Sequence, residues 1–249
     1  MSPPVFLMEP DPLNGESRLS GESVVLDGPE GRHAASVRRL RAGERVDLTD
    51  GAGLLAECVV TAAGKTTLTL DVLARHRHPR PEPRLVVVQA LPKGDRGELA
   101  VETMTEVGVD EIVPWAASRC VTQWKPERRD KALGRWRSTA REAAKQARRP
   151  WFPEVTDLAT TAQVAERIKT AAGALILHED ATSPLSAVRP PTTGEIILIV
   201  GPEGGITDDE RDLFTTAGGR PTLLGPTVLR TSTAGVAAAA ILLAATGRW

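Results

Sequence analysis

The sequence predicts an α/β protein in which a small β-rich domain precedes a mostly parallel sheet. Apolar runs without polar alternation, such as 85–90, 174–177 and 196–200, are typical of strands buried on both faces under helices. Short β-type runs with glycine and proline turns occupy the first 74 residues. A proline-rich stretch separates the two patterns, so we expect two domains.

Residues 1–74 are expected to form a small β-barrel or sandwich. Turn signals such as Asp27-Gly28-Pro29 separate four β-type runs, which span 23–26, 44–48, 54–60 and 66–73. A basic helix is predicted at about residues 31–41. Residues 75–83 are predicted as a linker, because the segment 76–83 holds three prolines and no apolar side chain.

Residues 84–249 are expected to alternate strands with helices. Further strands are predicted at 112–115 and 222–224, and helices at about 97–107 and 132–148. Segment 233–246 is almost wholly Ala, Val, Ile and Leu, and such a helix is buried in a core or in a subunit interface. Its longest apolar run, of twelve residues, is shorter than the roughly 20 that a membrane span needs.

The composition indicates a globular protein of the cytoplasm. Apolar residues make up 41% and charged residues 25% of the 249 positions, which is too apolar for a disordered chain. No secretory signal follows Met1. Cys58 and Cys120 form neither a disulfide framework nor a zinc site, and the histidines do not cluster with acids. We therefore expect neither a metal nor a membrane as a partner.

Charge is distributed unevenly along the chain. The formal net charge is −1, yet residues 115–150 hold 11 basic and 3 acidic residues. Residues 32–45 hold 5 basic and 1 acidic, whereas residues 154–249 hold 7 basic and 11 acidic. Arginine predominates in the basic segments, and its planar fork suits phosphate oxygens. This pattern favours a nucleic acid as partner over a merely solvated surface.

Two glycine loops near the C-terminal end carry the clearest signal of a site. Gly201-Pro202-Glu203-Gly204-Gly205 follows a buried strand, and its small residues let backbone groups approach a ligand closely. Thr207 and Glu210 then form a capping box that opens a helix. Motifs for P-loop nucleotide hydrolysis, dinucleotide binding and serine hydrolysis are absent from the sequence.

The second loop begins at Leu224-Gly225 and passes through Arg230 into the apolar helix, with Ser232 or Thr233 as the predicted N-cap. We expect the strands before the two loops to be adjacent and parallel. Both loops would then lie at the carboxyl ends of the strands, where open α/β sheets bind ligands.

These residues resemble those of the RsmE-type family of SPOUT methyltransferases, which methylates N3 of a uridine in small-subunit (16S) ribosomal RNA. The matching segments are Gly201–Gly205, Leu224-Gly225, Leu229–Ala234, Gln89–Arg96, Glu106–Val109, Pro114–Arg119, Glu142–Arg149 and His33 with Val37 and Arg38. The resemblance spans nearly the whole chain. Ser232 departs from the glutamate usual in the family, and Cys120 stands where serine is common.

The resemblance implies a SPOUT-type parallel sheet with a C-terminal trefoil knot, preceded by a PUA-like β-barrel that binds RNA. It also implies S-adenosylmethionine as cofactor, held mostly by backbone groups, and a homodimer. The positions carried over as cofactor-binding are Leu177, His178, Glu179, Val200, Gly201, Pro202, Glu203, Gly204, Gly205, Leu224, Gly225, Val228 and Leu229.

Methylation at N3 of uracil requires removal of the imide proton and stabilisation of the resulting anion. A guanidinium aimed at a uracil carbonyl would supply that stabilisation, and Arg230 is the catalytic candidate. Arg230 has two alternative roles: it could clamp a phosphate of the RNA or pair with Glu203. No general base is evident in the motifs. Contacts to ribosomal RNA, naked or in the assembled 30S particle, are expected from His33, Arg38, Arg39, Lys93, Arg96, Arg119, Arg141, Lys145, Gln146 and Arg149.

Other functions are compatible with the same residues. A related SPOUT enzyme would methylate a ribose 2′-hydroxyl or a transfer RNA base. A non-catalytic RNA-binding assembly factor would keep the fold without the cofactor, although it would not need intact glycine loops. A DNA-binding regulator is less favoured, because no helix-turn-helix signal accompanies the basic segments.

Replacing Arg141 and Arg149 together with alanine should weaken RNA binding and flatten its salt dependence. Cofactor binding should stay unchanged, because phosphate contacts position the RNA and do not touch the nucleoside cofactor. Filter binding across a salt series and calorimetry with S-adenosylmethionine measure the two effects. An equal loss of cofactor affinity would contradict the assignment.

Overall fold

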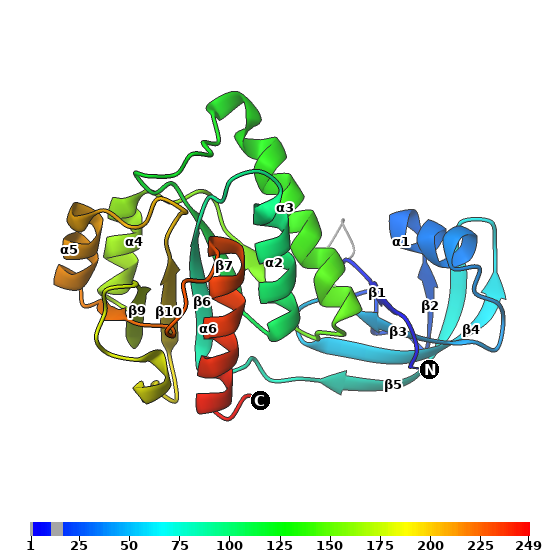
Figure 1. The fold of residues 1–249 in the computed structure, drawn as a ribbon. Helices are drawn as coiled ribbons and strands as arrows, with labels where there is room; N and C mark the ends of the chain where they lie inside the picture. Colours follow the sequence, from blue (N-terminus) through cyan, green and yellow to red (C-terminus); the bar gives the residue numbers. More distant parts are fainter. Residues whose placement is uncertain (1, 11–16) are drawn as a thin grey trace. The chain divides into compact units, whose positions relative to one another are not determined.

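The computed structural model describes residues 2–10 and 17–249, so that residues 1 and 11–16 of the expected β-domain lie outside the description. The chain divides into two compact units, shown as ribbons in Figure 1. The first comprises Met1–Arg80 with Ala144–Phe152, and the second comprises Pro81–Ala143 with Pro153–Trp249. Both glycine loops belong to the second unit.

The first unit contains a sheet with the strand order β1-β3-β4-β5-β2. Its strands are β1 (Val5–Leu7), β2 (Ser23–Leu26), β3 (Arg45–Thr49), β4 (Leu54–Ala63) and β5 (Leu68–Arg77). Alternate residues of β4, from Leu54 to Val60, are buried, which is the period of a strand with one face on a core. Strand β1 pairs parallel to β3, and the remaining pairs are antiparallel.

Two local features of this unit differ from the sequence prediction. The helical segment starts early, as α1 (Gly28–Arg32), because Pro29 suits a first helical turn, and it continues as a π-helical turn over His33–Val37. It stops before residue 41, since Arg39 adopts a φ of 56°. Strand β5 also extends to Arg77, into the expected linker, because its last residues pair with the start of β4.

The segment 144–152 packs against the β-domain, which the sequence pattern does not reveal. The Trp151 indole donates a hydrogen bond to the carbonyl of His78 at 3.1 Å, and the Gly53 N–H donates to the Pro150 carbonyl at 2.9 Å. A Cβ on Gly53 would lie 2.7 Å from the Trp151 ring, and its φ is 99°, so only glycine fits there.

The second unit is built on a sheet in which every strand pair is parallel, in the order β11-β9-β10-β6-β7-β8. The strands are β6 (Arg84–Ala90), β7 (Glu111–Trp115), β8 (Glu154–Val155), β9 (Gly173–Leu177), β10 (Glu195–Val200) and β11 (Arg220–Thr222). The central strands β6 and β10 are buried almost throughout, as expected of a sheet covered on both faces. This confirms the parallel α/β fold.

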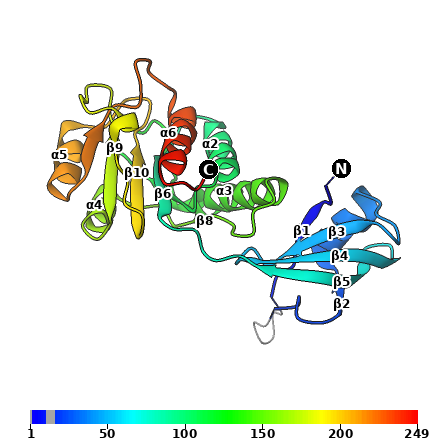
Figure 2. The same ribbon diagram turned by 90° about the horizontal axis from the view of Figure 1, so that it is seen from below.

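Five α-helices of this unit surround the sheet. They are α2 (Arg96–Val107), α3 (Pro126–Gln146, whose last three residues belong to the first unit), α4 (Thr161–Ile168), α5 (Asp208–Thr216) and α6 (Thr231–Ala245). Figure 2 shows α2 and α6 side by side on one face and α4 on the other. Gly235 of α6 allows a close approach, because a Cβ there would lie 2.8 Å from the Met104 sulfur.

Helix α6 starts two residues earlier than predicted. Arg230, and neither Ser232 nor Thr233, occupies its N-cap, and both Thr231 and Ser232 are buried. The buried face of α6 includes Ala238, Ala239, Leu242 and Leu243, whereas Thr233 and Ala244 are exposed. The trefoil knot that the resemblance implies stays a prediction. Among the described residues, none of the helices is long and apolar enough to cross a bilayer.

An ion-pair network joins the amino ends of the central strands. Glu111 at the start of β7 is 2% exposed and binds the guanidinium groups of Arg84 and Arg167. Arg167 also donates two hydrogen bonds of 2.7 Å to Glu195. Burial by itself lowers the pKa of Arg167, but the hydrogen bonds and charges of Glu195 and Glu111 outweigh it and raise that pKa. The network therefore stays charged.

The variant Glu111→Ala should lower the free energy of unfolding by about 3 kcal/mol, because it leaves two partly buried guanidinium groups without their shared carboxylate. Urea titration followed by circular dichroism measures the change. Glu166→Ala is the matched control, since it removes an exposed carboxylate paired with Lys169 and should cost at most about 0.5 kcal/mol. Similar losses of unfolding free energy in the two variants would show that the network does not contribute to stability.

Candidate active site

Three loops leave the sheet at one edge. Residues 177–179 begin at the last residue of β9, residues 200–205 begin at the last residue of β10, and residues 224–225 come shortly after β11. Because the strands are parallel, all three loops lie at their carboxyl ends. The expected adjacency of β10 and β11 is wrong, because β9 pairs between them. The consequence is a third loop, after β9, set between the two glycine loops.

The glycine loop after β10 is compact. The Gly205 N–H donates to the Pro202 carbonyl at 2.9 Å, and Gly205 has a φ of 75°, which favours glycine. A Cβ on Gly201 would lie 2.7 Å from the Ile206 side chain, and one on Gly204 would lie 3.0 Å from Arg119. The glycines therefore allow the loop to pack closely against Ile206 and Arg119. That its backbone also contacts a ligand stays a prediction.

Hydrogen bonds tie the start of α6 to this loop. The Thr231 hydroxyl donates to the Gly201 carbonyl at 2.6 Å and accepts from the buried Gln89 amide at 3.1 Å. Gln89 lies near the end of β6, so these two bonds join three segments that are distant in the sequence. They fix the backbone of Arg230, whose side chain is exposed and forms no ion pair with any described residue.

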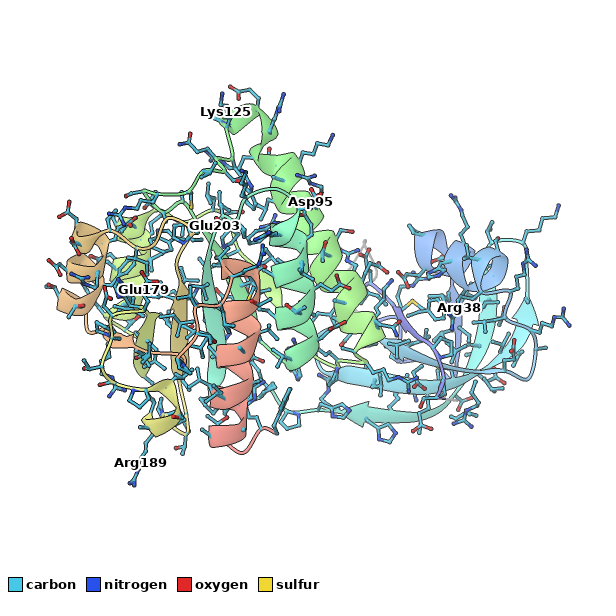
Figure 3. The ribbon with its side chains drawn as sticks, in the orientation of Figure 1. Arg38, Asp95, Lys125, Glu179, Arg189 and Glu203 are labelled. Carbon is cyan, nitrogen blue, oxygen red and sulfur yellow. The ribbon has the colours of Figure 1, made fainter. Side chains whose placement is uncertain are left out.

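The loops after β9 and β11 are joined through their backbones. The His178 N–H donates to the Thr222 carbonyl at 3.1 Å, and the Leu223 N–H donates to the Ser183 carbonyl at 2.8 Å. Leu177 and Leu224 are half-buried, whereas Val228 and Leu229 are exposed. Figure 3 labels Glu179 and Glu203, which stand on two of the three loops.

A nucleoside cofactor fits the groups at this edge. Around Gly225 the space is open, since a Cβ there would meet no atom within 4 Å. Leu177 ends β9 and Leu224 follows the neighbouring β11, and both are half-buried, so they provide apolar surface of the kind that suits a purine base. The described residues contain no group of three or more metal-binding side chains.

Glu203 has partners other than Arg230, with which a pair was one alternative. Its carboxylate accepts the Lys93 N–H at 3.0 Å, which joins the loop after β6 to the glycine loop. The Arg119 guanidinium donates to the Gly204 carbonyl at 3.1 Å, so a segment following β7 also reaches this loop. Lys93, Arg96 and Arg119 thus follow strands whose carboxyl ends lie at this edge.

Glu210 holds this side of the site together. It accepts hydrogen bonds from the N–H and hydroxyl groups of Ser118 at 2.8 and 2.9 Å, and from those of Thr207 at 3.1 and 2.9 Å. The capping box was expected from the sequence, but the bonds to Ser118 were not, because the two residues lie 92 positions apart. Through Ser118, Glu210 positions the neighbouring Arg119.

These bonds change the acidity of the carboxyl group. Burial by itself raises the pKa of Glu210, but the hydrogen bonds from Ser118 and Thr207 outweigh it and hold the pKa below the ordinary 4.5. The ionised form is thus stabilised by folding.

The other expected RNA contacts are dispersed. His33, Arg38 and Arg39 lie in the first unit, Arg141 and Gln146 are exposed on α3, and Arg149 follows this helix. The expectation that Lys145 contacts RNA is wrong. Lys145 is 7% exposed, and its ammonium group lies 2.6 Å from the Glu30 carboxylate. A buried and paired lysine is not available to RNA, and the helical period alone did not reveal its partner.

Comparisons with known proteins agree with this geometry. The model of an RNA methyltransferase domain matches residues 79–243, and that of an RNA methyltransferase PUA domain matches residues 26–73. The chain is 47% identical over 234 residues to the ribosomal RNA small subunit methyltransferase E of Mycobacterium bovis, covering 92% of this chain and 89% of that protein. The chain belongs to the RsmE family of RNA methyltransferases. The resemblance found in the motifs is therefore confirmed.

Other members of the family and solved structures also match this chain over most of its length. The RsmE protein of Bacillus subtilis is 29% identical, covering 84% of this chain and 85% of its own. The Neisseria gonorrhoeae RsmE structure, bound to S-adenosyl methionine, is 28% identical with a TM-score of 0.83 over 98% of both chains. A methyltransferase structure from Legionella pneumophila in complex with the same cofactor is 29% identical, with a TM-score of 0.83 and 98% of both chains covered.

The variant Glu210→Gln should be less stable than the wild type at neutral pH, and the difference should shrink in acid. Because the folded pKa of Glu210 is depressed, its contribution is present above pH 4.5 and is lost as the pH falls through the folded value. Unfolding free energies from pH 3 to pH 7 test this, with Asp209→Asn as an exposed control on the same helical turn. A difference that is constant with pH would contradict the ionic role.

Proposed function

We propose that this RsmE family member transfers a methyl group from S-adenosylmethionine to N3 of a uridine in small-subunit ribosomal RNA. The observation that carries the proposal is the convergence of three backbone-lined loops, after β9, β10 and β11, at one edge of the sheet. Support comes from the name of the Mycobacterium bovis relative and from the cofactor-bound Neisseria gonorrhoeae structure.

The proposed cofactor contacts are those of the three loops. Residues 177–179, 200–205 and 224–225 would hold the nucleoside, with Val228 and Leu229 beside them. When bound, the cofactor supplies a methyl group on a sulfonium, which is an excellent leaving group. The task left to this chain is to align the uridine with that methyl group and to favour loss of the N3 proton.

Arg230 is the proposed catalytic residue. Its backbone is held through Thr231 to the glycine loop, and its exposed guanidinium has no partner among the described residues. A guanidinium at this position can donate hydrogen bonds to a uracil carbonyl as the imide becomes an anion. Ser232, in place of the family's usual glutamate, is 3% exposed and carries no carboxylate, so we assign it no proton transfer.

We also propose the setting in which the reaction occurs. The exposed Arg38, Arg119 and Arg141 and the half-buried Arg96 would grip the RNA backbone without reading its sequence. Two copies of the chain would associate through the exposed apolar residues near the start of α6, including Val228, which is 80% exposed. The ribosomal substrate would place the enzyme in the cytoplasm.

Methylation of small-subunit particles from cells that lack the protein tests the function. We expect N3-methyluridine at a single position, found by mass spectrometry of the digested RNA. A 2′-O-methyl product would indicate a related enzyme of the superfamily. Absence of both methyl transfer and calorimetric binding of S-adenosylmethionine would leave only an RNA-binding protein.

Replacing Arg230 with alanine should lower kcat about 100-fold, the effect of one lost donor to a developing anion, without changing the affinity for S-adenosylmethionine. Arg189→Ala is the control, because Arg189 is exposed and follows the short helical turn Leu185–Ala187 (Figure 3). Single-turnover methylation and calorimetry separate the two quantities. A rise in KM for RNA with an unchanged kcat would instead make Arg230 a phosphate clamp.

A further inference from the structure

A cavity beside the proposed methyl site has no part in the function described so far. It has a volume of about 560 Å³, within the range of small-molecule sites. One wall is the loop after β6, including Leu91, Pro92 and Gly94, and another is the segment Thr122–Trp124. The third wall is one face of α3, where lining residues recur at helical spacing: Arg128, Lys131, Ala132, Arg135 and Trp136. We call it the Trp124 pocket.

Part of the pocket lining is apolar and aromatic. Leu91, Pro92, Ala132 and Trp136 are buried, and Trp124 is half-buried. The Trp124 and Trp136 rings meet at 84° with their centroids 5.1 Å apart, so the Trp124 indole is held in place while it lines the cavity. Gly97 permits this packing, because a Cβ there would lie 2.8 Å from the Trp136 ring.

The opening of the pocket is cationic. Arg128, Lys131 and Arg135 are all exposed on α3, and one acidic residue, Glu98, lies 3.4 Å from Arg135. An indole and a group of cations that line the same cavity match the two halves of a nucleotide, since a base stacks on the ring while its phosphates contact the cations. Stacking accepts any base, because every base has a π-face.

Hydrogen bonds connect the pocket walls to the proposed cofactor loop. The Thr122 hydroxyl donates to the Pro92 carbonyl at 2.8 Å, which closes the two loops of the pocket on each other. The backbone N–H of Lys93 in turn donates a hydrogen bond to the Glu203 carboxylate of the glycine loop. Figure 3 labels Asp95 and Lys125, on the loops that border the pocket, together with Glu203. RNA held here would therefore lie next to the proposed cofactor loop.

We propose that the Trp124 pocket binds an unstacked nucleotide of the substrate RNA that flanks the methylated uridine. The methylated base itself is placed elsewhere, because no residue of the loops 177–179, 200–205 or 224–230 lines this cavity. A flanking nucleotide anchored on Trp124 would pull the strand out of its stack and help to present the target uridine. This inference rests on the proposed function for its substrate.

The test uses variants that separate stacking from volume. Trp124→Phe keeps an aromatic face, whereas Trp124→Leu keeps bulk without one. With small-subunit particles as substrate, Trp124→Leu should raise KM about tenfold, Trp124→Phe should stay within about threefold of wild type, and kcat and the affinity for S-adenosylmethionine should not change in either. Wild-type KM in Trp124→Leu would overturn the proposal.

Charge is tested at the rim of the pocket. Arg128→Ala with Lys131→Ala should reduce the slope of log affinity against log salt by about 1.4, the value for two contacts to single-stranded RNA. Arg129→Ala is the matched control, because Arg129 is exposed on the same helix but does not line the pocket. Arg129→Ala should reduce the slope by less than half of the reduction in the double variant. An equal reduction per residue in the control would overturn the placement of phosphate here.

A binding measurement makes failure of this inference distinguishable from failure of the proposed function. A short oligoadenylate should quench the tryptophan fluorescence of the wild type, and the quenching should be lost in Trp124→Phe although the oligonucleotide still binds. If the protein neither binds S-adenosylmethionine nor methylates RNA, but Trp124-dependent quenching persists, the proposed function fails and the pocket stands. Trp136 also lines the pocket, so quenching that persists in the double variant Trp124→Phe with Trp136→Phe comes from a tryptophan outside it and refutes the pocket.

Discussion

In a parallel sheet each strand starts from the same edge, so all the loops that follow the strands meet at the opposite edge. The order β11-β9-β10-β6 brings together four such loops, which begin near Thr222, Leu177, Val200 and Ala90. The proposed cofactor contacts come from three of them, and the fourth borders the Trp124 pocket. Without this strand pairing, segments up to about 130 residues apart in the chain would have no reason to meet.

Hydrogen bonds between side chains and backbone groups hold these loops together. Thr231 joins α6 to Gly201, Glu203 joins the loops after β6 and β10, and Glu210 joins the segment after β7 to α5. Backbone groups and short side chains leave room for a ligand at close range. The strongly paired charges instead lie at the amino ends of the strands, where Glu111 and Arg167 stabilise the sheet away from the chemistry.

The electrostatics follow the same division. The loops of the proposed cofactor site depend mostly on neutral backbone, whereas the cations are gathered on α3 and in the segments before it. A nucleoside cofactor needs shape and hydrogen bonds, while RNA needs phosphate contacts. Helix α3 also shows that charge alone is a poor guide, because Lys145 belongs to the basic run but is buried against Glu30.

Local sequence determined most strands, most helix positions and the family, because the burial of a segment is recorded in its own apolar pattern and the glycine loops in their own residues. The strand predicted at 222–224 is displaced, since β11 spans Arg220–Thr222. Local sequence missed β1 and β8, of three and two residues, since such short strands have no pattern. The tertiary structure alone decided that β9 separates β10 from β11, that Glu210 binds Ser118 and that Trp124 lines a cavity with α3. The first two depend on a partner far along the chain, and the cavity depends on the distant loop after β6 as well as on the neighbouring α3. Packing in three dimensions chooses these partners.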